Sequence, residues 1–207
     1  MRCLYLHGFA SGTGSRKARA FQAALADKGV EMNIPDLADG RFDRLTISGQ
    51  LDVIDRVLQG SPARLVGSSL GGYLAALYAA AHPEVDRLVL LAPAFDFCAR
   101  WGQLAGAGKM RNWRETGWAE VYHYGDSAMR RLHYGFYEDA MRHDPNPAFT
   151  QAALIFHGIH DDTVPVGSSR VFTAAHANAV LREVDSDHEL LNALDEIIGA
   201  AVPFLTE

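Results

Sequence analysis

A serine, a histidine and a carboxylate stand at positions in this 207-residue sequence where a hydroxyl could be activated for nucleophilic attack. Ser69 lies at the centre of Gly67-Ser68-Ser69-Leu70-Gly71, directly after the apolar residues Leu65 and Val66. A strand that makes a sharp turn into a helix exposes the side chain at the apex of the turn, where a nearby base can deprotonate it. Glycine suits the two flanking positions because a Cβ atom there would collide with neighbouring backbone.

The base, and the acid that orients it, are expected just past the ends of other strands. Open parallel sheets bind ligands at the carboxyl ends of their strands. His188 follows a predicted strand near the end of the sequence, and Asp161 follows another. His188 would accept the Ser69 proton, and Asp161 would fix the tautomer of the imidazole. Asp162 is interpreted as a solvated or turn-capping carboxylate, and Asp96 is a reserve candidate for the acid.

Two backbone N–H groups could stabilise the oxyanion that forms when Ser69 attacks a carbonyl carbon. One belongs to Leu70, which begins the helix after the turn. The other is expected in the loop Leu6-His7-Gly8-Phe9-Ala10, where Phe9 is the predicted donor. Two donors aimed at one point form an oxyanion hole.

Short apolar runs alternate with helical patterns along the chain, which is typical of a mostly parallel sheet flanked by helices. We expect an α/β fold with about six strands, at Cys3–His7, Glu31–Ile34, Arg64–Val66, Arg87–Leu91, Ala153–Phe156 and Leu181–Val184. Helices are predicted at Ser15–Lys28, Leu45–Leu58, Leu70–Ala81, Ser168–Ala177 and Glu189–Ala200.

Residues 95–150 interrupt this alternation, and we interpret them as a cap inserted into a single domain that spans residues 1–207. All three tryptophans of the chain lie in this interval, together with several tyrosines and phenylalanines. A helical stretch is predicted at Ser127–Arg142. The aromatic residues together predict an apolar acyl pocket beside Ser69, with Trp101, Trp113 and Tyr134 as its tentative substrate-binding residues.

Composition excludes several kinds of partner. A formal net charge of −6 argues against nucleic acid, which calls for a basic face. No apolar run approaches the roughly 18 residues of a membrane span, and Arg2–His7 is predicted as a strand rather than part of a signal peptide. Cys3 and Cys98 are expected to be free thiols in a reducing cytoplasm. His157 and His160 have no further ligand pattern beside them, so we predict loop packing and no metal site.

Four stretches of the sequence together resemble those of a small α/β-hydrolase-fold serine hydrolase, specifically the compact bacterial esterases of the YqiA type. They are Leu4-Tyr5-Leu6-His7-Gly8-Phe9-Ala10-Ser11, Gly67-Ser68-Ser69-Leu70-Gly71-Gly72, His157-Gly158-x-x-Asp161-Asp162-x-Val164-Pro165 and Ser186-Asp187-His188. The order serine, acid, histidine along the chain is that of this superfamily. The resemblance implies cleavage of short-to-medium acyl esters through an acyl-serine intermediate, without a metal or organic cofactor. The expected partner is a small-molecule ester or thioester, and the oligomeric state is left open.

Three alternatives remain. An acyl thioesterase would use the same residues, and arginines in the cap leave an anionic substrate or a coenzyme A thioester open. A dinucleotide-binding oxidoreductase would use the glycines of Gly8–Gly14 and place Asp36 at a ribose. However, no lysine follows a tyrosine at the Tyr-x-x-x-Lys spacing of such enzymes. The third alternative is a hydrolase-like binding protein without catalytic activity.

Overall fold

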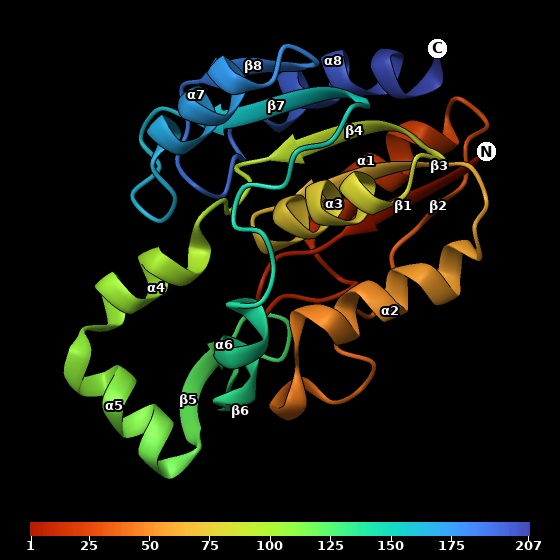
Figure 1. Ribbon diagram of the computed structural model, residues 1–207. Coiled ribbons are helices and arrows are strands. Elements are labelled where there is room, and N and C mark those ends of the chain that lie inside the picture. The colour runs from red at the N-terminus through yellow and green to blue at the C-terminus, as the bar shows by residue number, and fades with distance from the viewer.

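Six strands form the centre of the computed structural model, which describes residues 1–207 (Figure 1). Every pairing in this sheet is parallel, and the strand order is β2-β1-β3-β4-β7-β8. The predicted α/β fold with about six mostly parallel strands is therefore confirmed. The strands are β1 (Arg2–Leu6), β2 (Met32–Asn33), β3 (Ala63–Ser68), β4 (Val85–Leu91), β7 (Ala152–Gly158) and β8 (Ala179–Val184).

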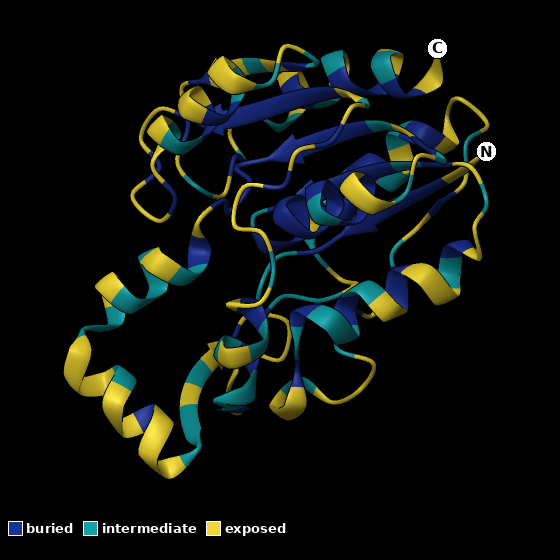
Figure 2. Cartoon of the chain, viewed as in Figure 1, coloured by how far each residue is buried: buried dark blue, intermediate teal, exposed yellow.

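Helices cover both faces of the sheet, because successive strand side chains point to opposite faces. In β1, Cys3 and Tyr5 pack on one face against α1 (Arg16–Ala26) and α8 (Leu194–Thr206). The intervening Leu4 and Leu6 pack on the other face. That second face is covered by α2 (Ile47–Leu58), α3 (Leu70–Ala81) and α7 (Val166–Ala175), and a short 3-10 helix, η1 (Phe42–Arg44), precedes α2. Figure 2 shows that the inner strands β1, β3, β4 and β7 are mostly buried, whereas the edge strand β8 is largely exposed.

Residues 95–150 form a separate group of elements at one end of the sheet, in the lower left of Figure 1. They are α4 (Phe97–Ala105), α5 (Ala107–Thr116), β5 (Trp118–His123), β6 (Ala128–His133) and α6 (Gly135–Ala140), and we call them the cap. The cap shares its buried side chains with the sheet, because Phe97, Trp113 and Phe136 belong to the same apolar cluster as Leu4 and Leu88.

The helix predicted at Ser127–Arg142 is wrong in its first half. Ala128–His133 is instead strand β6, which pairs antiparallel with β5 from Trp118↔His133 to His123↔Ala128. The guanidinium of Arg131 lies 4.3 Å from the Trp118 ring centroid. Cross-strand contacts of this kind stabilise strands independently of local helical propensity. Only Gly135–Ala140 forms a helix.

The last helix begins later than predicted, at Leu194 rather than Glu189. Leu190 is fully buried and has a φ of 58°, a left-handed conformation that a right-handed helix cannot contain. His188 therefore lies on a loop and not at a helix start. None of the helices combines the length and apolar character that crossing a bilayer demands.

Candidate active site

Ser69 occupies the predicted sharp turn between β3 and α3. Its backbone has φ 54° and ψ −117°, an unfavourable conformation for a residue with a side chain. A Cβ atom at Gly71 would overlap the carbonyl groups of Leu6 and His7, and one at Gly67 would overlap the backbone of Gly71. Only glycine allows this approach of the turn to β1, as the sequence predicted.

His188 lies between Ser69 and Asp161, and its two ring nitrogens contact one residue each. The His188 Nε2 atom is 3.0 Å from Ser69 Oγ, and His188 Nδ1 is 2.7 Å from Asp161 Oδ2. The three residues follow β3, β7 and β8, which end at the same edge of the sheet. With Nδ1–H donating to the carboxylate, Nε2 is left free to accept the hydroxyl proton. Asp162 is exposed, as expected, and Asp96 is exposed at the start of α4, so the reserve candidate is not the partner of His188.

The Asp161 side chain is fully buried and its carboxylate accepts several hydrogen bonds. Oδ1 accepts from the N–H groups of Thr163 (2.9 Å) and Val164 (2.7 Å). Burial by itself raises the pKa of this carboxyl group, but the hydrogen bonds from His157, His188 and Val164 outweigh it and hold the pKa well below its ordinary value. Asp161 is therefore ionised at neutral pH and can stabilise a protonated His188.

Two residues beside this carboxylate were not expected there. His157 is fully buried, and its Nε2 atom lies 3.2 Å from Asp161 Oδ2, so it packs against the carboxylate as well as the loop. A Cβ atom at Gly158 would overlap the carbonyl groups of Ser186 and Asp187. Glycine at 158 therefore lets the acid loop approach the histidine loop. The signal in the sequence was the His157-Gly158 pair at the end of a buried strand.

Phe9 and Leu70, which carry the two predicted oxyanion donors, line the same cavity as Ser69. The N–H groups of Phe9 and Leu70 make no hydrogen bond within the chain. A Cβ atom built on Gly8 would lie 3.5 Å from Ser69 Cβ, which shows how closely this loop passes the turn. The cap contacts the loop as well, because Tyr124 N–H donates to the Ala10 carbonyl oxygen at 2.7 Å. Two unpaired donors beside a hydroxyl are the arrangement that stabilises a tetrahedral oxyanion.

An apolar cavity of about 350 Å³ opens at Ser69 between the sheet and α4. Trp101 lines it as predicted, with its ring 4.9 Å from that of Phe9. The structure corrects the placement of the other two aromatic residues, because neither Trp113 nor Tyr134 lines the cavity. Trp113 is buried within the cap, where its Nε1–H donates to Leu132, and the Tyr134 ring packs against it. The remaining lining residues include Leu70, Ala94, Phe95, Phe97, Leu104 and Val164.

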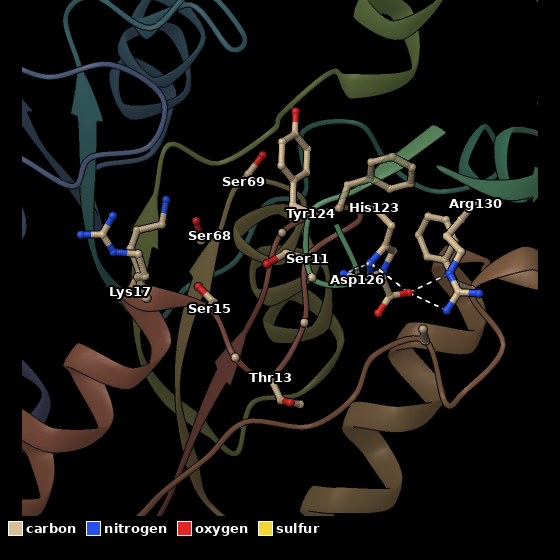
Figure 3. Close-up of a pocket in the computed structure, with 18 of the residues that line it drawn as sticks. Ser11, Thr13, Ser15, Lys17, Ser68, Ser69, His123, Tyr124, Asp126 and Arg130 are labelled. Carbon is tan, nitrogen blue, oxygen red and sulfur yellow. Dashed lines mark hydrogen bonds and ion pairs between the residues drawn. The ribbon is translucent and has the colours of Figure 1, made fainter. Parts of the chain in front are cut away.

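A second, polar cleft of about 1600 Å³ lies on the His188 side of Ser69. Figure 3 shows Lys17 on one side of Ser69 and the linked side chains of His123, Asp126 and Arg130 on the other. The Lys17 ammonium donates to the Glu189 carbonyl oxygen at 2.8 Å and so connects α1 to the histidine loop. Burial lowers the pKa of Lys17 to about 8, against the opposing effect of nearby carboxylates. The sequence gave no sign that this lysine lies near His188.

No group of three or more histidine, cysteine or acidic side chains is arranged to hold a metal ion. His160 pairs with Asp185 at 2.9 Å and is exposed, whereas His157 is fully buried. Cys3 and Cys98 are both free, which confirms the expectation of two unpaired thiols.

The chain matches the model of the Uncharacterised protein family (UPF0227) over residues 2–206. It belongs to that family. The human palmitoyl-protein thioesterase ABHD10, a mitochondrial protein by its name, is 32% identical over 173 residues, which cover 76% of this chain and 55% of the relative. The chain thus spans about half the length of this relative.

Two solved structures show the same fold. Mouse alpha/beta hydrolase domain-containing protein 10 matches with a TM-score of 0.82 and 20% identity over 98% of this chain and 88% of its own. Est1E from Butyrivibrio proteoclasticus with bound ferulic acid matches with a TM-score of 0.82 and 24% identity over 98% of this chain and 86% of its own. The predicted α/β-hydrolase fold is confirmed.

Proposed function

We propose that this chain is a serine hydrolase that cleaves carboxylic esters through an acyl-serine intermediate. The observation that carries the proposal is the hydrogen-bonded series Ser69–His188–Asp161 beside two unpaired backbone N–H groups. His188 takes the Ser69 proton as the hydroxyl oxygen attacks the ester carbonyl. Asp161 holds the imidazole and stabilises the resulting imidazolium, and the N–H groups of Phe9 and Leu70 bind the oxyanion.

The second half of the reaction uses the same residues. Collapse of the tetrahedral intermediate expels the alcohol, which receives the proton from His188 Nε2. Water then attacks the acyl-serine, and His188 removes a proton from that water. The second tetrahedral intermediate then breaks its bond to Ser69 Oγ and releases the acid, and His188 returns the proton to Ser69 Oγ.

The two hollows beside Ser69 suggest how an ester would lie. His188 must deliver its proton to the leaving oxygen, so the leaving group belongs on the side of the polar cleft, which His188 lines. The acyl group then belongs in the apolar cavity, which Trp101 and Phe9 line and His188 does not. This orientation fits a short-to-medium apolar acyl chain.

The direct test is Ser69→Ala in the purified protein. Hydrolysis of short p-nitrophenyl esters should fall by about 10⁴–10⁶-fold, the range seen when such a nucleophile is removed. Ser61→Ala is the matched control, because Ser61 precedes β3 at the opposite end of that strand, and it should keep full activity. A fluorophosphonate probe should label the control and not Ser69→Ala. Retained turnover in Ser69→Ala would end the assignment.

Thioester cleavage is the second candidate, favoured by the name of the ABHD10 relatives. An acyl-thioester reacts with the same nucleophile and oxyanion hole. Rates on p-nitrophenyl esters of increasing acyl length, compared with the matching acyl-coenzyme A, distinguish the two reactions. A kcat/KM for the thioester at least equal to that for the ester would make thioesterase the better description.

Two further expectations remain proposals. We do not expect binding of a nicotinamide dinucleotide, and a thermal-shift assay with NAD and NADP should show no change in Tm. The free thiols of Cys3 and Cys98 suit a reducing compartment such as the cytoplasm. Cell fractionation that finds the protein in an oxidising compartment would contradict that location.

A further inference from the structure

His157 is the one fully buried histidine of the chain, and each polar atom of its ring has a partner. Its Nδ1 atom lies 2.7 Å from the Ser169 hydroxyl oxygen on α7. Its Nε2 atom lies 2.7 Å from the Val164 carbonyl oxygen and 3.2 Å from Asp161 Oδ2. A buried imidazole is costly unless it is hydrogen-bonded, so this ring is held in one orientation.

The surroundings of His157 determine where its proton lies. A carbonyl oxygen and a carboxylate oxygen can only accept hydrogen bonds, so Nε2 carries the hydrogen that faces Val164 and Asp161. In the neutral ring, Nδ1 then accepts a hydrogen bond from the Ser169 hydroxyl group. The Val164 and Asp161 oxygens thus select the tautomer of His157, much as Asp161 selects that of His188, and Ser169 supplies the hydroxyl that Nδ1 needs.

The Asp161 Oδ2 atom is consequently shared between two imidazoles. It accepts His188 Nδ1–H at 2.7 Å, and His157 Nε2–H, which donates to the Val164 carbonyl oxygen at 2.7 Å, lies 3.2 Å from it. The two rings approach it from β7 and from the loop after β8. A second donor restricts the carboxylate to one rotation and withdraws part of its negative charge from His188.

We infer that His157, held by Ser169, is a positioning residue that orients the Asp161 carboxylate toward His188 and limits how strongly that carboxylate retains the His188 proton. The inference rests on the proposed function. The sequence assigned His157 to loop packing and gave it no part in the reaction.

The consequence for pH dependence has a definite sign. Without the His157 donor, Asp161 accepts more strongly from His188, and His188 keeps its proton to higher pH. Because the reaction requires neutral His188, the acid limb of the kcat/KM profile should move to higher pH. Without His157 the Asp161 carboxylate can also rotate away from His188, which should reduce kcat.

Charged groups from several elements face this cluster and must stay constant in the test. Lys17 on α1 lies near Asp161, and Arg100 on α4 donates to the carbonyl oxygens of Asp162 and Thr163. Asp187 and Glu189 flank His188 on its loop. Glu183 on β8 is close enough to His157 for their charges to interact. None of these residues is altered in the variants below.

The experiment compares His157→Phe, His157→Gln and Ser169→Ala with the parent protein. His157→Phe removes the donor and keeps a ring, whereas a glutamine amide at 157 can still donate. His157→Phe should lower kcat about tenfold, the order found when outer partners of a catalytic group are removed, and should shift the acid limb upward by about half a pH unit to one unit. His157→Gln should recover most of both effects, and Ser169→Ala should show a smaller shift in the same direction.

Fluorophosphonate titration of Ser69 normalises each rate to the active fraction, so partial misfolding does not imitate the result. His160→Gln is the matched control, since His160 is an exposed histidine in the loop directly after β7, and its acid limb should not move. If His157→Phe does not fold, His157→Gln and Ser169→Ala decide between the outcomes. An acid limb unchanged in every folded variant, with normal kcat per labelled Ser69, would show that His157 only packs. Loss of labelling in the parent protein would instead overturn the proposed function itself.

Discussion

Asp161 illustrates how a single side chain can combine full burial with full ionisation. Three hydrogen bonds, two from backbone N–H groups and one from His188, together with the nearby His157 ring, replace the water that the carboxylate lacks. That Ser69, His188 and Asp161 lie together could be predicted because each type has a chemical role and each follows a strand. The part of His157 could not, since its contact with Asp161 depends on the path of residues 158–164, which no local pattern specifies.

Acid stability should depend on Asp161. Its folded-state pKa lies below the ordinary value of about 3.9, so on acidification the unfolded chain takes up the proton first. The stabilising contribution of ionised Asp161 to the free energy of unfolding should therefore be present above pH ~4 and be lost as the pH drops further. Asp161→Asn should flatten this fall, whereas Asp162→Asn, the exposed neighbour, should not. Urea unfolding of each variant at about pH 6 and pH 3 measures the loss of unfolding free energy between the two pH values. A loss in Asp161→Asn as large as in the parent protein would contradict the prediction.

The same carboxylate should matter more for the rate than for stability at neutral pH. Asp161→Asn would favour the wrong tautomer of His188 and should lower kcat on p-nitrophenyl esters by about 10⁴-fold. Because substrate contacts are unaffected, KM should stay within about twofold. Steady-state kinetics on Asp161→Asn and Asp162→Asn provide the comparison, and a loss confined to KM would be inconsistent with this role.

At the scale of elements, loops after separate strands are brought together by backbone contacts. The loop after β7 contacts the loop after β8, with Ile159 N–H donating to Val184 and His160 N–H donating to Ser186, both at 3.0 Å. The six strands could be predicted from apolar runs. The hairpin β5–β6 could not, because its strands are stabilised by each other, and the late start of α8 depends on the left-handed conformation of one buried leucine.

Gly158→Ala tests the contact between these loops. The added methyl group would overlap the Ser186 and Asp187 carbonyl groups and displace His188. A displacement near 1 Å can cost about 10²-fold in kcat, so we expect a loss of that order. Gly167→Ala is the control, because a Cβ atom there meets nothing within 4 Å. It should leave kcat unchanged and stabilise the protein by about 0.4–1 kcal/mol. Equal activity of the two variants would refute the role of the close approach.

For the molecule as a whole, the site lies between the sheet and the cap, and each contributes one side of it. The sheet holds the reacting groups, and α4 supplies Trp101 and Leu104 to the apolar cavity. The sequence indicated that aromatic residues of the cap gather near Ser69. It could not separate the aromatic residue that faces the cavity from those that form the interior of the cap, because that depends on how α4 and α5 fold.

Trp101→Ala should enlarge the acyl cavity and change selectivity for chain length. The ratio of kcat/KM for long to short p-nitrophenyl esters should rise about tenfold, the scale of one to two methylene contacts. Trp118→Ala is the matched control, since Trp118 lies in the β5–β6 hairpin beneath Arg44 and Arg131. The long-to-short ratio of Trp118→Ala should equal that of the parent protein. If Trp101→Ala also keeps the parent ratio, the acyl chain does not bind beside Trp101.

All three tryptophans of the chain lie in the cap and none in the sheet. Intrinsic fluorescence therefore reports on the cap, whereas far-ultraviolet circular dichroism is dominated by the sheet and its flanking helices. Because Trp113 and Phe97 are buried in the same apolar cluster as Leu88 of β4, the two optical signals should change at the same denaturant concentration. A fluorescence change that precedes the loss of ellipticity would reveal a cap that opens while the sheet stays folded.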